Sequence, residues 1–163
     1  MKNIVILLAG SLMMTGGSFA QKVAPENVPD AVKIAFRAKF AQAEKTTWEM
    51  DYENFEADFK INKVDISAKF DANGNWLETE TPLTLSNLPP AVKAALSKQF
   101  DPIKDPLKED GISKIETPAG TNYEIDGQNN ALSYVLIISE KGDLVKKEEV
   151  KDEKEKVKDP KEK

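Results

Sequence analysis

Two segments of the chain place apolar residues on one face of an amphipathic helix. Residues four apart along an α-helix lie on the same side of it, so a repeat of this spacing predicts a buried stripe. The two stripes are Val32, Phe36 and Phe40, and Val92, Leu96 and Phe100. Pro29 and Pro89 precede them and suit the first turn of a helix, where the missing N–H has no helical partner to lose. The pattern therefore predicts two helices.

After each predicted helix, apolar and polar residues alternate with a period of two. This alternation is typical of antiparallel strands with one buried face and one solvated face. The predicted strands are residues 47–51, 55–61, 64–70 and 76–81 in the first half, and residues 112–117, 122–126, 132–139 and 144–149 in the second. Gly74 and Gly142 lie in predicted turns, where glycine tolerates a positive φ.

These two halves resemble each other in sequence. Residues 28–36, VPDAVKIAF, return as residues 88–96, LPPAVKAAL, and Phe55–Asp58 corresponds to Tyr123–Asp126. The offset grows from 60 to 68 residues, so the second copy holds about eight additional residues. Segment 101–107 is rich in proline and charge, which is typical of a loop.

The repeat predicts the fold class and the domain organisation. We expect an α+β fold of two tandem modules, residues 21–83 and 84–149, each a helix packed on a four-stranded antiparallel sheet. Residues 150–163 are nearly all lysine and carboxylate, and such low hydrophobicity predicts a disordered tail. Alternating charges leave a solvated helix over residues 148–158 as the alternative.

The first twenty residues have the layout of a secretory signal peptide. Lys2 precedes an apolar run, and Ser18 and Ala20 place small residues three and one positions before a cut ahead of Gln21. A membrane anchor is the alternative, but a spanning helix needs about 20 apolar residues and this run is roughly half as long. We therefore predict a periplasmic or secreted protein that is not inserted in the membrane after cleavage.

The composition excludes several kinds of site. The 163 residues include no cysteine and no histidine. Disulfides, zinc sites built on Cys or His, cysteine nucleophiles and Ser-His-Asp triads are therefore ruled out. The formal net charge is −5, and an acidic chain repels the phosphates of nucleic acids and anionic lipid headgroups. We predict neither a cofactor nor a metal.

The order of the motifs resembles the PepSY-like family of beta-lactamase-inhibitor-like proteins. The residues that carry the resemblance are 28–40, Trp48-Glu49, 52–59 and 70–77, with the same signature returning from Leu88 to Val145. The resemblance implies two helix-on-sheet modules that share a concave face, and a binding or inhibitory role in the cell envelope. Leu144 stands where the first copy has Trp76, so the two halves of such a face would differ.

The open face of the predicted sheet is the candidate binding surface. In the first half, Glu56, Asp58 and Lys69 alternate with residues expected to face the helix. In the second half, Val135 and Ile137 would point outward and be exposed, as would Trp76 on its own strand. Exposed apolar and aromatic side chains favour a protein or peptide partner in the envelope. The alternative is that Trp76 and Val135 cover a sheet end or the seam between the copies.

Three other functions compete with this prediction. Trp76 would serve a small-molecule or glycan binder as a stacking platform. Paired carboxylates on neighbouring strands, as in a hydrolase, are present as Glu56, Asp58, Glu124 and Asp126. Segment 71–75, DANGN, resembles the start of a calcium loop, but position twelve from Asp71 is Pro82 rather than glutamate. Because no feature of the sequence indicates an enclosing pocket, we expect a non-enzymatic protein and a plain turn at residues 71–75.

Overall fold

The computed structural model describes residues 21–99, 107–129 and 132–151. Its elements are β1 (Gln21–Lys22), the 3₁₀-helix η1 (Pro25–Asn27), α1 (Asp30–Lys39), β2 (Glu44–Asp51), β3 (Asn54–Ile61), β4 (Val64–Phe70), β5 (Trp76–Pro82), η2 (Leu85–Asn87), α2 (Pro90–Gln99), β6 (Leu107–Thr117), β7 (Gly120–Asn129), β8 (Leu132–Ser139) and β9 (Leu144–Lys151). Both predicted helices and all the predicted strands are present, and β1, η1 and η2 are additional.

One continuous antiparallel sheet contains all the described strands, in the order β1 to β9. The halves join where β5 pairs with β6, from Thr79 opposite Glu116 to Pro82 opposite Ser113. The prediction of two modules, each with its own four-stranded sheet, is therefore wrong. Two separate sheets would leave the backbone N–H and C=O groups of β5 and β6 as free edges, and pairing the two strands satisfies them.

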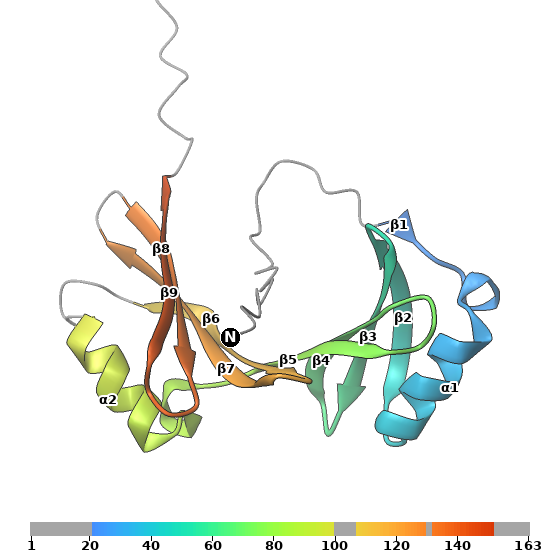
Figure 1. Ribbon diagram of the computed structural model, residues 1–163, viewed down its shortest axis with the longest axis horizontal. Helices are drawn as coiled ribbons and strands as arrows, with labels where there is room; N and C mark the ends of the chain where they lie inside the picture. The colour runs from blue at the N-terminus through green and yellow to red at the C-terminus, as the bar shows by residue number, and fades with distance from the viewer. Residues whose placement is uncertain (1–20, 100–106, 130–131, 152–163) are drawn as a thin grey trace, which may run out of the picture.

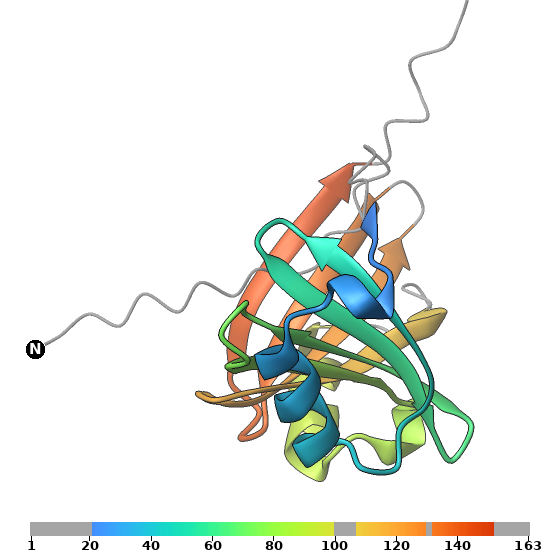
Figure 2. The same cartoon turned by 90° about the vertical axis from the view of Figure 1, so that its right-hand side faces the viewer.

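The sheet is strongly curved, and both helices lie on its convex side. Figure 1 shows α1 against one end of the sheet and α2 against the other, with β5 crossing the middle. Figure 2, turned by 90°, shows α1 in front of the sheet, on the side away from the space between the two halves that is seen in Figure 1. The concave side is the open face on which the sequence placed a binding surface.

Each helix covers its own hydrophobic core. Under α1, Phe36 makes edge-to-face contacts with Trp48 and Phe59, at centroid distances of 5.2 and 5.1 Å, an arrangement that aromatic rings favour. Under α2, Val92 and Leu96 pack against strands β6 to β8. The strand residues of the two cores are Trp48, Phe55, Ala57, Phe59, Ala68 and Phe70, and Ile112, Tyr123, Ile125, Tyr134, Leu136 and Ile138. For β3, β4 and β8 the alternation in the sequence predicted these faces, and the structure confirms them.

Two tight turns tie the sheet to the helices. Gly74, after β4, has φ +84°, and a Cβ there would lie 2.6 Å from the carbonyl oxygen of Ala31. Gly142, after β8, has φ +88°, and a Cβ added there would lie 2.7 Å from the carbonyl oxygen of Ala91. Both positions therefore require glycine, for its left-handed backbone and for the lack of room.

The turn at residues 71–75 uses its carboxylate internally. Asp71 accepts hydrogen bonds from the backbone N–H groups of Asn73 and Asn75, each 2.9 Å long, and from the Asn75 side-chain amide at 2.7 Å. These bonds lower the pKa of Asp71 below its usual value, the Asn75 amide having the largest effect. The carboxylate thus stabilises the turn between β4 and β5.

Several expectations concern residues outside the described part of the chain. These are the signal peptide at residues 1–20, Phe100 of the second helical stripe, most of the loop at 101–107, and the tail from residue 152. The last strand extends through Lys151, so the alternative of a helix beginning at residue 148 is wrong for residues 148–151. Within the described part of the chain, no helix is both long and apolar enough to cross a membrane.

Candidate binding surface

The concave face consists of the side chains of β2 to β9 that point away from α1 and α2. Strand register assigns them, because residues directly opposite each other in an antiparallel pair lie on the same face. Its charged members include Glu44, Glu49, Asp51, Glu56, Asp58, Asp65, Glu78, Glu80, Glu124, Asp126 and Glu148, with Lys45, Lys60, Lys69 and Lys146. Carboxylates therefore greatly outnumber lysines on this face.

Lys69 is the central base of the first half. It lies between Glu56 on β3 and Glu78 on β5 in the strand register. Its Nζ is 3.1 Å from a carboxylate oxygen of Asp51 and 3.9 Å from one of Glu56. Burial alone would lower the pKa of Lys69, but the Glu56 and Asp51 carboxylates outweigh burial and raise it. The lysine is therefore fully charged at neutral pH.

The carboxylates around Lys69 are partly desolvated. Burial raises the pKa of Glu56 and of Glu78 above its ordinary value, and the Lys69 ammonium offsets part of each rise. Burial also raises the pKa of Asp58, to which the charges of Glu49 and Asp65 add. Because these charged groups are partly buried, they interact more strongly with other charges than groups on an ordinary solvated surface do.

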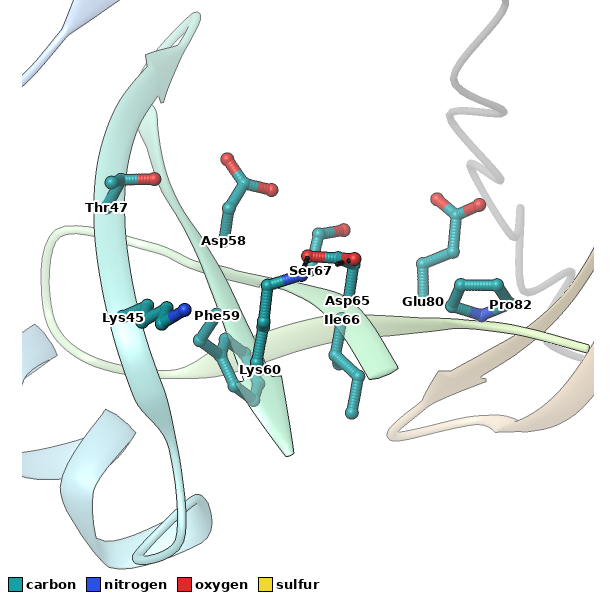
Figure 3. A pocket seen from close by; sticks show the side chains of 10 residues that line it. All are labelled: Lys45, Thr47, Asp58, Phe59, Lys60, Asp65, Ile66, Ser67, Glu80 and Pro82. Atoms are coloured by element: carbon teal, nitrogen blue, oxygen red, sulfur yellow. Dashed lines mark hydrogen bonds and ion pairs between the residues drawn. The ribbon is translucent and has the colours of Figure 1, made fainter. Parts of the chain in front are cut away.

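A hollow of about 420 Å³ lies on the first half of this face. Figure 3 shows Thr47, Asp58, Ser67 and Glu80 rising from β2 to β5 toward its open side. In the register these four residues form one row across the four strands. At one side of the hollow, Lys60 donates a hydrogen bond of 2.7 Å to Asp65. The hollow is thus lined mainly by polar side chains.

The second half carries a different centre. Ile137 stands on β8 at the position that the repeat assigns to Lys69, and it pairs with Glu124 on one side and Lys146 on the other. Burial raises the pKa of Glu124 to about 7, and the charges of Glu80, Asp126 and Glu78 add to the rise, while Lys146 opposes it. Glu124 is therefore partly protonated near neutral pH.

Two isoleucines of the concave face are buried although no helix covers them. Ile137 is 2% exposed and Ile115 on β6 is 5% exposed. Val135 is half-buried. The expectation that Ile137 is exposed is therefore wrong. Its neighbours across the strands, Glu124 and Lys146, have long side chains, and sheet curvature brings side chains on the inner face closer together.

Trp76 lies on the opposite side of the sheet from the one predicted. A bulge between Lys69 and Phe70 shifts the register, so that Trp76 pairs with Phe70 and packs against the core under α1. Its indole N–H donates a 2.9 Å hydrogen bond to Thr79 Oγ1. The ammonium of Lys39 sits 3.5 Å from the ring centroid, so one ring face is already occupied by a cation–π contact.

The sequence pattern of one protein family spans most of this face. The family described as "Putative beta-lactamase-inhibitor-like, PepSY-like" matches residues 53–146, more than half of the chain. The chain belongs to this PepSY-like family. The match confirms the resemblance noted in the sequence, and the two central positions, Lys69 and Ile137, both lie within it. No protein with a curated functional description matches the chain in sequence.

Solved structures share the fold of this PepSY-like chain. A BLIP-like protein from Bacteroides fragilis is 27% identical, with a TM-score of 0.67 over 76% of this chain and 88% of that one. A structure from Bacteroides eggerthii, described as "putative periplasmic proteins", is 21% identical, with a TM-score of 0.68 over 76% of this chain and 90% of that one. That description agrees with the location predicted from the first twenty residues.

The sequence placed only part of the concave face of this PepSY-like protein. It put Glu56, Asp58, Lys69, Val135 and Ile137 on the open side, and the register agrees. It did not single out Glu78 and Glu80, although the phase that set Trp76 outward also sets these two residues outward, and it missed Ile115 because the faces of β6 were not assigned. It also missed Tyr52, which is 87% exposed at the turn between β2 and β3, with φ +55°.

Proposed function

We propose that this chain is a non-enzymatic binding protein that acts outside the cytoplasm and holds a protein or peptide of the cell envelope on its concave face. The observation that carries the proposal is the open concave face itself. It runs across β2 to β9 of one sheet and includes the hollow of about 420 Å³. Membership of a beta-lactamase-inhibitor-like family supports binding, and inhibition of an envelope enzyme would be one form of it.

A continuous sheet suits this role because it holds recognition groups rigidly. The row Thr47, Asp58, Ser67 and Glu80 is fixed by backbone hydrogen bonds between every neighbouring pair of strands. Rigid groups lose little conformational entropy when a partner binds. Tyr52 at the rim adds the kind of large exposed aromatic side chain that is enriched where partners anchor.

The competing functions have less support from the geometry. A glycan stacks on an open aromatic face, whereas one face of Trp76 is covered by Lys39 on the convex side. The carboxylates predicted as acid and base, Glu56, Asp58 and Glu124, lie on an open sheet face rather than in an enclosed pocket of the kind that catalytic sites use. Protein binding is therefore the function we propose.

The test is affinity capture from an envelope extract, with the chain from Gln21 onward as bait. A variant with Thr47→Tyr and Ser67→Tyr fills the hollow, because both side chains line it. A matched control with Ala38→Tyr and Ser97→Tyr adds comparable bulk to exposed positions of α1 and α2. We expect the wild type and the control to capture the same protein and the hollow variant to lose it.

The captured protein is then purified and titrated calorimetrically with the three baits. A dissociation constant weakened at least about tenfold by the hollow variant alone, or roughly 1.4 kcal/mol, would place the partner on the concave face. Equal affinity for all three baits contradicts the proposal. If the captured protein is an enzyme, its turnover with and without the chain shows whether binding also inhibits it.

A further inference from the structure

The middle of the concave face holds carboxylates that are not ion-paired with a lysine. Within the described residues, Glu78, Glu80 and Glu124 form no ion pair. Three lysines of this face are engaged with other acids: Lys60 with Asp65, Lys69 with Asp51 and Glu56, and Lys146 with Glu148 at 3.0 Å. A fourth, Lys45, lines the hollow together with Glu80 but forms no ion pair with it. The lysines that share this face therefore compensate the negative charge in its middle only in part.

This charge lies on two strands, β5 and β7, with β6 between them. Glu80 on β5 pairs with Ile115 on β6, and Glu124 on β7 pairs with Ser113 on β6. Only one strand therefore separates the two acids. Around Glu124 the charged groups are Glu80, Asp126 and Glu78, which repel its charge, and Lys146, which attracts it. Repulsion dominates, so a cation placed here would relieve it.

Apolar side chains stand among these acids. Ile115 lies directly across from Glu80, and Ile137 lies directly across from Glu124. Both are almost fully buried, and Val135 beside Ile137 is half-buried. Apolar neighbours reduce the screening of charge by water, so each carboxylate interacts more strongly with an incoming cation than it would in bulk solvent. They also suit the aliphatic stem of a lysine or arginine side chain.

We propose, building on the proposed function, that the partner is a polypeptide that inserts a lysine or arginine side chain between Glu80 and Glu124 in the middle of the concave face. The guanidinium or ammonium group takes the place of the missing base and donates hydrogen bonds to the carboxylates. Its charge favours the ionised form of Glu124, which releases its proton to the buffer as the complex forms. Binding is therefore coupled to proton release near neutral pH.

The probe is an acetylated and amidated peptide with two arginines separated by one leucine. Its control has citrulline, a neutral isostere, in place of both arginines. Calorimetric titration of the chain from Gln21 onward should show the arginine peptide binding at least about tenfold more tightly, because a hydrogen-bonded charge contributes on that order. Repeating the titration at pH 7 in buffers with different enthalpies of ionisation should reveal protons released on binding.

Two double variants remove the same total charge at different places. Glu80→Gln with Glu124→Gln removes the central acids, whereas Glu26→Gln with Glu140→Gln removes exposed acids of η1 and of the turn before β9. We expect the first variant to lose the preference for arginine and the proton release, and the second to keep both. Equal binding of the two peptides, binding of neither, or equal losses in both variants would overturn the proposal.

The same variants separate this inference from the proposed function. A captured protein that is lost with the hollow variant but binds the Glu80→Gln, Glu124→Gln variant at full affinity would leave the concave face as the binding surface and overturn the cationic partner. A captured protein insensitive to every concave-face variant would overturn the proposed function itself.

Discussion

The two halves of the sheet place different residues at the same central position. In the first half Lys69 lies between Glu56 and Glu78, and in the second half Ile137 lies between Glu124 and Lys146. Burial raises the pKa of both Glu56 and Glu124. The largest charge effect at Glu56 comes from Lys69, which lowers its pKa, whereas at Glu124 the neighbouring acids outweigh Lys146. The repeated backbone thus carries a lysine at this position in the first half, where it balances nearby carboxylates, and an isoleucine in the second half, where the carboxylates have less positive charge beside them.

The largest effect should come from the cores and should show whether the halves unfold together. Leu96→Ala removes a buried side chain under α2 and should lower the free energy of unfolding by about 2–5 kcal/mol. Both tryptophans, Trp48 and Trp76, lie in the first half. Because the sheet is continuous, the denaturation midpoint should fall equally by tryptophan fluorescence and by circular dichroism. An unchanged fluorescence midpoint would mean that the halves unfold independently.

The two glycine turns should respond alike. Gly74→Ala and Gly142→Ala each place a Cβ under 3 Å from a helix carbonyl and impose a positive φ on alanine. Each should cost about 2 kcal/mol of stability, measured by thermal or chemical denaturation. Gly120 is the control, because its Cβ would meet nothing within 4 Å, although its φ is also positive. A loss at Gly120 as large as at the other two would show that backbone conformation alone, and not contact with the helices, sets the cost.

Exchanging the central residues tests the comparison directly. Lys69→Met should destabilise the protein by about 1–2 kcal/mol at pH 8, because Glu56 and Asp51 lose their shared counter-charge. Ile137→Lys should lower the pKa of Glu124 from about 7 toward its usual value. Chemical denaturation at pH 8 would measure the first change, and carboxyl chemical shifts followed by NMR over a pH titration would measure the second. A pKa of Glu124 unaffected by Ile137→Lys would mean that burial alone determines it.

The smallest effect concerns stability as a function of pH. The pKa of Glu124 is about 7 in the folded protein, against an ordinary value of 4.5. The folded state therefore binds more protons than the unfolded state between these values, so this group makes stability fall as pH rises from 4.5 to 7. Glu124→Gln should stabilise the protein at pH 8 by about 1 kcal/mol, a figure reduced for solvent screening. At pH 4 the two proteins should match, and a destabilised variant at pH 8 would contradict the assignment.

Alternation along each strand was enough to predict which face a residue occupies. It correctly separated Glu56 and Asp58 from Phe55 and Phe59, because the period of a strand fixes its two sides. It carries no information about which strands become neighbours, so the pairing of β5 with β6 was not predicted. A β-bulge shifts the pairing of two strands by one residue, so that side chains beyond it change face, and no clear sequence signal marks it. Trp76 was therefore assigned to the wrong face of the sheet.

Burial on the concave face was equally hidden from the sequence. The pattern placed Ile137 on the open side, and an isolated open strand would expose it. Its burial depends on the long side chains of neighbouring strands and on sheet curvature, which are properties of the assembled sheet. The excess of carboxylates could be counted from the sequence, but that Glu80 and Glu124 are not ion-paired with a lysine emerged only from the structure.

The strand order has a consequence for folding kinetics. Every described strand pairs only with its neighbours in the chain, so most contacts close short loops, and proteins with such local contacts fold fast for their size. The sheet can therefore grow from either end, one strand at a time. A connection containing η1 and α1 separates β1 from β2, and the longest connection, containing η2, α2 and the residues after it, separates β5 from β6. Growth of the sheet should be slowest there, and a chain halted at that step would present β5 as an unpaired edge.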